Sequence, residues 1–199
     1  RLDLPPELAI WEVDQPAVQK QKLARMEAFA SKDSTVAERM NHSVHYVPVD
    51  FNADDLSERL RSAEGFEEGQ LSVVTLEGVT QYIPKESTFD TLRKLRSLVA
   101  PGSVVLVSYV DQNVRDNPTA VGPARSIKSL VNLAGKVGEP WISMWTEEAF
   151  RQDLDAIGYE VLSNTTCKDY NDSWLAPLGR SMKPEEITSA ERFVVARVK

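Results

Sequence analysis

The sequence predicts an α/β protein of Rossmann type, with an open, mostly parallel sheet that carries helices on both faces. Segments with strand character alternate with segments of helical period along most of the chain. Two of the strand segments, residues 71–76 and 103–110, are apolar without alternation, as expected of strands that are covered on both faces. No convincing helix separates the last two strand segments, so we expect the final strand to be antiparallel.

Proline and glycine mark the boundaries of these elements. Pro16 suits the first position of a helix, and Gly65, Gly102 and Gly158 each follow a helical segment. Pro48 favours an edge position for its strand, because it cannot donate to a neighbouring strand. The predicted strands are residues 8–13, 44–49, 71–76, 103–110, 159–165 and 193–198, and the predicted helices are residues 16–29, 54–63, 85–99 and, after the capping residue Thr146, 147–157.

Composition and charge restrict the class of protein. The 199 residues are 42% hydrophobic and 27% charged, which is typical of one globular domain over residues 1–199. The net charge is −7 and no run of Lys and Arg occurs, so we expect no binding to nucleic acid or to an anionic membrane surface. Neither a membrane span of roughly 20 apolar residues nor a secretion signal is visible in the sequence, and the expected location is the cytoplasm.

Metal ligands are scarce in this chain. Cys167 is the single cysteine, and His42 and His45 are the two histidines. One cysteine cannot form an internal disulfide, and so few soft ligands do not make a structural zinc site. We therefore predict no metal site.

Residues 111–145 differ in character from the rest of the chain. They are rich in Asn, Pro and Gly, and they contain one helical candidate at residues 126–134 and two tryptophans, Trp141 and Trp145. We predict an inserted lid or substrate-recognition segment. The alternative is that both tryptophans simply pack under a long loop.

Three successive strands end in a carboxylate, namely Asp14, Asp50 and Glu77. Ligands of open α/β sheets bind at this edge. Asp14 could accept hydrogen bonds from ribose hydroxyls or cap the following helix. Asp50, with Phe51 beside it, could accept from the exocyclic amine of an adenine or stabilise a turn. Glu77 precedes Gly78, where the backbone can bend close to a ligand; the alternative is a buried acid held by local hydrogen bonds.

Four motifs carry a resemblance to a known family. They are WEVDQP at residues 11–16, VPVDF at 47–51, LEGVTQYI at 76–83 and GEPW at 138–141. Together they resemble the leucine carboxyl methyltransferase family of S-adenosylmethionine-dependent methyltransferases. The E-x-D-x-P step of the first motif and the EGV..YI segment are the most specific, and the resemblance extends through essentially the whole chain.

The resemblance implies S-adenosylmethionine as the cofactor and assigns residues to it. Asp14 would bind the ribose, and Asp50 with Phe51 would contact the adenine edge. Glu77 would bind the amino group of the methionine moiety. Glu12 is a second candidate, although strand alternation points it to the other face from its neighbours.

The resemblance also implies a methyl acceptor. Tyr82 would face this acceptor and help to hold its carboxylate; the alternative is a half-buried aromatic side chain on a turn. A carboxylate of a small molecule or of a protein C-terminus is already a nucleophile and needs no general base. Neither His42 nor His45 follows a predicted strand, which favours such an acceptor over a hydroxyl group.

One departure from the family is large. Its members carry a glycine-rich strand-to-helix turn ahead of the E-x-D-x-P step, and this chain has no such turn. The strand before that turn belongs at the sheet centre, between the strands that end at Asp14 and Glu77, so we expect the 199 residues to be an N-terminally incomplete copy. Two alternatives remain: a nicotinamide-dependent Rossmann enzyme, and a non-catalytic Rossmann-like binding module that has lost its cofactor loop.

Overall fold

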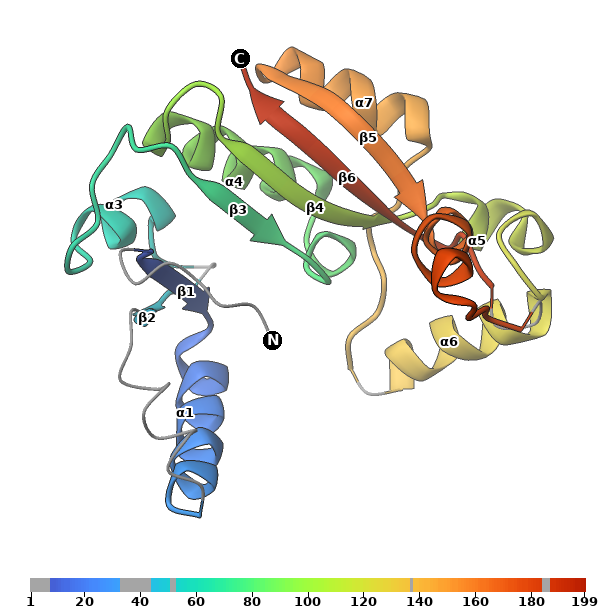
Figure 1. The fold of residues 1–199 in the computed structure, drawn as a ribbon, viewed down its shortest axis with the longest axis horizontal. Coiled ribbons are helices and arrows are strands. Elements are labelled where there is room, and N and C mark those ends of the chain that lie inside the picture. Colours follow the sequence, from blue (N-terminus) through green and yellow to red (C-terminus); the bar gives the residue numbers. More distant parts are fainter. Residues whose placement is uncertain (1–7, 33–43, 51–52, 137, 184–186) are drawn as a thin grey trace. The chain divides into compact units, whose positions relative to one another are not determined.

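The chain folds into two compact units, Arg1–Glu68 and Gly69–Lys199, each with its own sheet. The computed structural model describes residues 8–32, 44–50, 53–136, 138–183 and 187–199. In Figure 1 the first unit runs from blue to cyan and the second from green to red. The strands that were expected to share one open sheet thus belong to a two-stranded and a four-stranded sheet.

The first unit is a parallel β-α-β step followed by a short helix. Its elements are β1 (Ile10–Asp14), α1 (Pro16–Ala30), β2 (Val44–Pro48) and α3 (Leu56–Arg61). Pro16 opens α1 as predicted, and β2 pairs with β1 from Val44 opposite Ile10 onwards. Pro48 is the last residue of β2 and lies opposite Asp14. Among the described residues β2 pairs with β1 alone, so the predicted edge position of this strand is confirmed.

The second unit contains a mixed four-stranded sheet. Its strands are β3 (Val73–Leu76), β4 (Val104–Val110), β5 (Tyr159–Thr166) and β6 (Glu191–Val198), in the order β3-β4-β6-β5. β3 and β4 are parallel, whereas β6 is antiparallel to both β4 and β5. The predicted antiparallel final strand is therefore confirmed. This arrangement brings the carboxyl ends of β3, β4 and β5 to one edge, which we call the carboxyl edge.

Two helices cover one face of this sheet. They are α4 (Lys85–Leu98) and α7 (Glu147–Ala156), and Figure 1 shows both on the same side of the strands. Thr146 caps α7 as predicted, because its hydroxyl accepts a hydrogen bond from the amide of Ala149 at 3.2 Å. Each fully buried leucine in this layer contributes about 1.5–3 kcal/mol. The core consists of Phe89, Leu92, Val105, Val107, Tyr109, Trp145, Phe150, Leu154, Tyr159, Val194, Ala196 and Val198.

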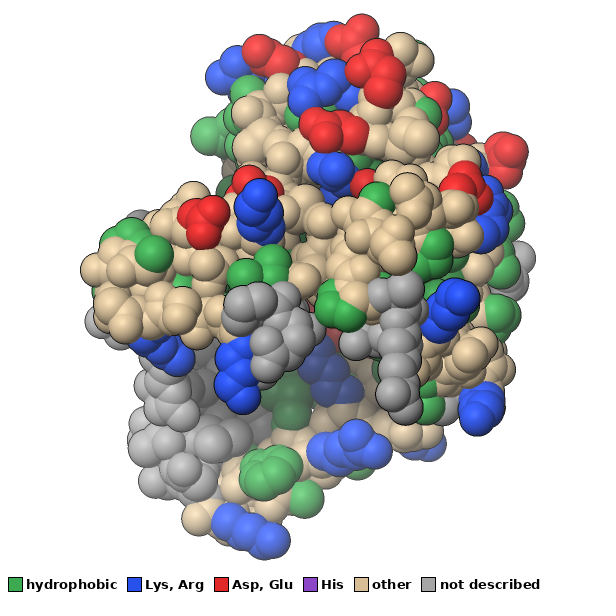
Figure 2. All heavy atoms as spheres, turned by 90° about the vertical axis from the view of Figure 1, so that its right-hand side faces the viewer, with side chains coloured by type: hydrophobic (Ala, Val, Ile, Leu, Met, Phe, Trp, Pro, Cys, Tyr) green, Lys and Arg blue, Asp and Glu red, His purple; other side chains and the backbone are tan. Residues whose placement is uncertain are grey.

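The outer face of α7 is charged. Arg151 forms an ion pair with Glu147 one turn away, and Lys199 pairs with Asp155. Acidic and basic side chains are interspersed at the top of Figure 2, the height at which α7 lies in Figure 1. The helix is therefore amphipathic, with Phe150 and Leu154 on its buried side.

The opposite face of β3 is open to solvent. Val74 and Leu76 pack against the core, whereas Leu71 and Val73, which alternate with them, are 74% and 73% exposed. The expectation that residues 71–76 are covered on both faces is wrong for this unit, because α4 and α7 both lie on the side of Val74 and Leu76. An apolar run without alternation does not by itself show that two layers are present.

The connections of the second unit hold most of the short helices. They are η1 (Thr80–Tyr82), α5 (Asn113–Asp116), η2 (Pro118–Ala120), α6 (Ala124–Lys136), α8 (Cys167–Tyr170), η3 (Asn171–Leu175) and η4 (Ala176–Leu178). α6 confirms the predicted helical candidate at residues 126–134. The continuous helical run 167–178 replaces a predicted loop, since its Asn, Asp and Pro residues give no clear apolar period. No helix in the described ranges is long and apolar enough to cross a membrane.

Candidate functional site

Glu77 directly follows β3 at the carboxyl edge and is open to solvent. Its carboxylate makes no hydrogen bond or ion pair with any part of the chain that the structure describes. The alternative of a buried acid held by local hydrogen bonds is therefore wrong. A carboxylate that is exposed at the ligand-binding edge of an α/β sheet and has no protein partner is available to a ligand.

The turn after Glu77 is fastened to β4. Gly78 has a φ of 67°, in the left-handed region that glycine enters without strain, and its amide donates to Oγ of Ser108 at 2.9 Å. Thr80 is fully buried, and its hydroxyl donates to the carbonyl of Ser108 at 2.7 Å. Two bonds to one residue of the neighbouring strand thus fix the backbone on which Glu77 stands.

Tyr82 ends the short helix η1 that follows this turn. Its side chain is 38% exposed, which agrees with a half-buried aromatic on a turn and also leaves the ring accessible. The flanking backbone is tied to the chain after α6, because the carbonyl of Gln81 accepts from the amide of Ile142 at 2.8 Å and Ser143 donates to the carbonyl of Ile83 at 2.6 Å. Tyr82 therefore stands on a fixed support beside Glu77.

Asp14 and Asp50 lie in the first unit, at the ends of β1 and β2. Asp14 is half-buried and its Oδ1 accepts from the amide of Gln15 at 2.7 Å. The N-cap position of α1 is occupied by Gln15, whose side chain makes no capping hydrogen bond. The alternative of Asp14 as the helix cap is thus wrong. Asp50 does occupy a turn, because its carbonyl accepts from the amides of Ala53 and Asp54 at 2.9 and 2.7 Å. Phe51, the predicted neighbour of the adenine, lies outside the described residues.

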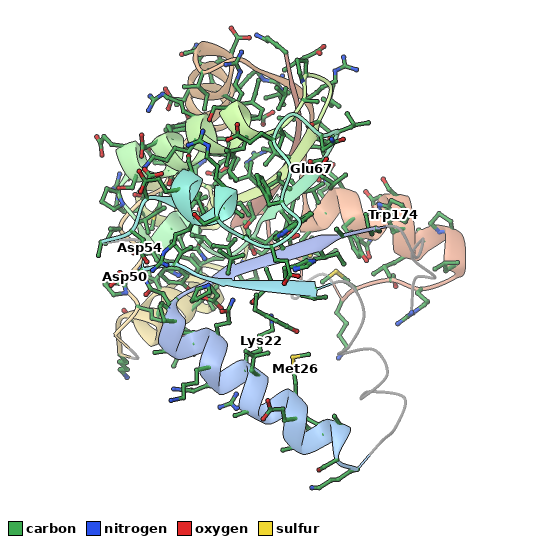
Figure 3. All side chains as sticks on the ribbon, turned by 90° about the vertical axis from the view of Figure 1, so that its left-hand side faces the viewer. Lys22, Met26, Asp50, Asp54, Glu67 and Trp174 are labelled. Carbon is green, nitrogen blue, oxygen red and sulfur yellow. The ribbon has the colours of Figure 1, made fainter. Side chains whose placement is uncertain are left out.

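The turn at Asp50 is closed by Asp54. The amide of Asp50 donates to Oδ2 of Asp54 at 2.9 Å, and Arg59 donates to the same carboxylate (Figure 3). Both bonds favour the ionised form of Asp54 and hold its pKa below the ordinary value. The bond from the amide of Asp50 has the larger effect, and the bond from Arg59 has the next largest. Asp54 is thus a structural acid that positions Asp50.

The carboxylate of Glu12 bonds to two side chains of helix α1. One of its carboxylate oxygens accepts from Nε2 of Gln19 at 2.7 Å, and the other pairs at 2.7 Å with Nζ of Lys22, which Figure 3 labels on α1. Both contacts tie β1 to the helix that follows it. The geometry gives Glu12 a structural role in holding Asp14 at the end of its strand.

A charged cluster at the carboxyl edge was missed by the sequence analysis. Arg192 is the second residue of β6; its Nε donates to Oδ2 of Asp111 at 2.7 Å, and its Nη1 donates to Glu147 at 2.9 Å. Burial is the largest single effect on Arg192 and disfavours its charge. The hydrogen bond to Asp111, together with the charges of the neighbouring groups, outweighs burial, and the pKa of Arg192 is raised. Asp111 directly follows β4, so the same strand-end signal that selected Glu77 could have found it.

The two tryptophans of residues 111–145 are both packed. Trp145 is fully buried in the main core, with its ring against Phe89, Tyr109 and Phe150, so a lid role for this side chain is wrong. Trp141 packs, partly buried, against the second cluster of the unit, which is formed by Val110, Val114, Val121, Ile127, Met144 and Ala190. Trp145 thus packs in the main core, against side chains of α4, β4 and α7.

The fold and the strand-end carboxylates define the class, a Rossmann-like α/β protein with its ligand edge at the strand carboxyl ends. A DUF574 family protein from Streptomyces avermitilis superposes with a TM-score of 0.61 at 14% identity, over 98% of this chain and 66% of that one. An O-methyltransferase family protein from Burkholderia thailandensis gives 0.57 at 14% identity, over 98% and 45%. At such identities the likeness establishes the fold.

The sequence comparisons show which proteins the chain is similar to. Residues 1–96 match the family model of leucine carboxyl methyltransferase. YktD of Bacillus subtilis (strain 168), provisionally named an S-adenosyl-L-methionine-dependent methyltransferase, is 28% identical over 165 residues, which are 83% of this chain and 50% of YktD. The family whose model matches residues 1–96 is the one that the motifs resemble. The chain spans half the length of this relative.

Proposed function

We propose that the protein is an S-adenosylmethionine-dependent O-methyltransferase whose methyl acceptor is a carboxylate of a small molecule or of a protein C-terminus. The observation that carries this proposal is Glu77, an exposed and unpartnered carboxylate on a fixed turn at the carboxyl end of β3. It lies within the segment that matches the family model, and the name of YktD gives S-adenosyl-L-methionine as the methyl donor of that relative. Because the chain spans half of YktD, the proposal concerns the full-length protein.

Three strand-end carboxylates are assigned to the cofactor. Glu77 accepts hydrogen bonds from the amino group of the methionine moiety, a charge-assisted contact. Asp14 accepts from the ribose hydroxyls, and Asp50 with Phe51 binds the adenine edge. Glu12 supports the cofactor site indirectly, because its carboxylate oxygens bond to Gln19 and Lys22 and so fix α1 against β1.

The acceptor carboxylate is positioned by Tyr82. The bound cofactor supplies an activated methyl group, and an ionised carboxylate attacks it without a general base. The hydroxyl of Tyr82 donates to one carboxylate oxygen and orients the other toward the methyl group. Such positioning contributes several kcal/mol, up to about 7–11 kcal/mol in favourable cases.

Residues 111–145 are proposed as the acceptor-recognition segment. This segment leaves the carboxyl edge at Asp111 and forms α5, η2 and α6. It ends at Trp145, which forms a parallel β-bridge with Asp111. Between these two anchors lies the segment whose backbone bonds to Gln81, next to Tyr82. The segment therefore connects the acceptor side of the site to the core.

Equilibrium binding of S-adenosylhomocysteine and of a nicotinamide dinucleotide to the full-length protein tests the proposal. We expect the protein to bind S-adenosylhomocysteine and not the dinucleotide. Glu77→Gln should lower the affinity for S-adenosylhomocysteine more than tenfold, or about 1.4 kcal/mol, and leave the far-ultraviolet spectrum unchanged. The matched control is Glu86→Gln, an exposed acid in the first turn of α4. Dinucleotide binding instead would support the nicotinamide-dependent alternative, and no binding of either would support the non-catalytic module.

A further inference from the structure

Strand β2 has one edge that pairs with no other strand among the described residues. Its other edge pairs with β1, where the amide of Val49 donates to the carbonyl of Asp14 at 2.9 Å. Successive residues of a strand direct their backbone N–H and C=O groups to opposite edges. Since Val49 faces β1, the backbone groups of Val44, Tyr46 and Pro48 face the unpaired edge. Two N–H groups and three carbonyls are thus open to a further strand, because proline has no N–H.

A groove of about 320 Å³ lies along this edge. It is lined by the consecutive residues 45–48 of β2, by Arg59 of α3, and by Ser62, Ala63 and Glu64, which follow that helix. Side chains of successive strand residues point to opposite faces of a sheet, so a groove that touches four residues in a row follows the edge of the strand. The groove therefore runs beside the unpaired edge of β2, and α3 with the residues after it forms its wall.

Arg59 lies at the carboxyl end of this groove. Its Nη2 donates to both carboxylate oxygens of Asp54, at 3.1 and 3.0 Å. Asp54 in turn accepts from the amide of Asp50, two residues after Pro48, and Figure 3 labels Asp50 and Asp54 next to one another. Both bonds to Asp54 use Nη2, and Nε and Nη1 bond to no group in the part of the chain that the structure describes. A second carboxylate can therefore bind to this guanidinium.

Glu64 lies at the amino end of the groove. Its carbonyl accepts from Nε1 of Trp11 at 3.2 Å, and the ring of Trp11 stacks on His45 with centroids 5.4 Å apart. The carboxylate of Glu64 is exposed and makes no hydrogen bond or ion pair with the residues described. His45 and Pro48 are three residues apart, which is about 10 Å along a strand. A positive and a negative side chain thus stand at the two ends of one edge.

We propose that the unpaired edge of β2 binds a second copy of this chain, which adds its own β2 antiparallel and joins the two sheets into one. A two-fold axis perpendicular to the sheet places the amino end of one β2 beside the carboxyl end of the other. Arg59 of each copy then faces Glu64 of the other, so the pair occurs twice in the dimer. A parallel addition would instead place Arg59 beside Arg59. This inference does not depend on the proposed function.

The backbone and the charges have different parts in this interface. Hydrogen bonds between the two strands supply the contact, but Pro48 limits their number, because it cannot donate to the partner strand. The two ion pairs select the antiparallel arrangement, since opposite charges attract and like charges at an interface repel. One added copy covers the edge of β2, so the assembly closes as a dimer and does not extend into a filament.

Sedimentation velocity of the full-length protein at low salt tests the inference. We expect a dimer, and Arg59→Glu and Glu64→Arg should each weaken dimerisation at least about tenfold, because each change sets like charges together twice. An equimolar mixture of the two variants should restore the dimer, since all of its contacts then join unlike charges. Arg61→Glu is the matched control and should leave the dimer unchanged; Arg61 is half-exposed on α3, pairs with Glu68 and does not line the groove.

The mixture also shows that both variants are folded, because unfolded chains could not restore the dimer. A monomeric unmodified protein overturns the proposal, and the edge is then open to a strand of another protein. A dimer that persists in both single variants overturns it too, because the copies then meet at another surface. So does a mixture that stays monomeric. Independently of any variant, raising the salt from about 0.05 to about 0.5 M should weaken the dimer, and an unchanged association constant contradicts the two ion pairs.

Discussion

Arg192 and Asp111 join the first residues of β6 to the end of β4 through a 2.7 Å hydrogen bond between Nε and Oδ2. The side chain of Asp111 is 4% exposed and that of Arg192 is 19% exposed, so this pair is largely withdrawn from water. Oδ1 of Asp111 also accepts from the amide of Asn113 at 2.9 Å. The pair therefore fixes the point at which residues 111–145 leave the sheet.

Asp111→Asn should destabilise the second unit. The variant keeps the shape of the side chain but leaves the guanidinium of Arg192 with Glu147 as its remaining charged partner, and we expect a loss of about 2–3 kcal/mol. Urea unfolding measures it. The matched control is Glu160→Gln, which breaks the half-exposed pair with Arg197 and should cost less than about 1 kcal/mol. Equal losses would mean that burial of the first pair is unimportant.

Tyr82→Phe should separate acceptor binding from cofactor binding. The variant removes the hydroxyl that is proposed to orient the acceptor carboxylate and keeps the ring. We expect a higher KM or a lower kcat by about tenfold, with the affinity for S-adenosylhomocysteine retained. Loss of cofactor affinity in this variant would show that Tyr82 belongs to the cofactor side of the site.

Two buried tyrosines should make the protein sensitive to alkali. Burial raises the pKa of Tyr109 and of Tyr159 to about 12. Above about pH 10 the unfolded chain loses phenolic protons that the folded protein keeps. The free energy of unfolding should therefore be intact below pH 10 and fall as the pH rises toward 12.

Urea unfolding at pH 9, 10 and 11 measures this loss. Tyr159→Phe should reduce the dependence on pH, although it also removes the 2.9 Å hydrogen bond from the tyrosine hydroxyl to the carbonyl of Leu92. Tyr170→Phe, at an exposed position, is the control and should leave the slope unchanged. A flat profile in the unmodified protein would contradict the burial of both phenols.

Alanine should have opposite effects at two glycines. Gly158 has a φ of 89°, and a Cβ there would lie 2.5 Å from Nε of Arg96, so Gly158→Ala should cost about 1 kcal/mol or more. Gly135 lies inside α6, where an added Cβ would meet nothing within 4 Å, and Gly135→Ala should stabilise by up to about 1 kcal/mol. Thermal unfolding gives the sign of each change, and a shared sign would contradict one of the two backbone assignments.

The sequence predicted the local structure well where one signal dominated. Pro16 fixed the start of α1, Thr146 fixed the cap of α7, and the period of residues 85–99 matched α4. It failed at the run 167–178, where polar residues form helical turns because a capping box and the contacts of Asn171 hold them. Such side-chain bonds leave no periodic signal.

Prediction of the candidate site was uneven for a related reason. Glu77 and Tyr82 were identified from their place after a strand and from family motifs, and both are exposed at the carboxyl edge. Trp145 was misjudged, because a tryptophan in a polar segment gives no sign of the core that receives it. Asp111 was overlooked, although it too follows a strand.

The sequence by itself determined the fold class, the resemblance to a methyltransferase family and the strand-end carboxylates, because these depend on residue types at short spacing along the chain. The tertiary structure decided which of these groups have partners. In the folded protein the carboxylate of Glu12 bonds to side chains of α1, whereas that of Glu77 is exposed to solvent. Asp111 bonds to Arg192, which is 81 residues away in the sequence. The tertiary structure also left the side chains of Tyr170 and Trp174 exposed on the run 167–178. Burial and pairing depend on residues that are distant in sequence, so they appear only when the strands are assembled.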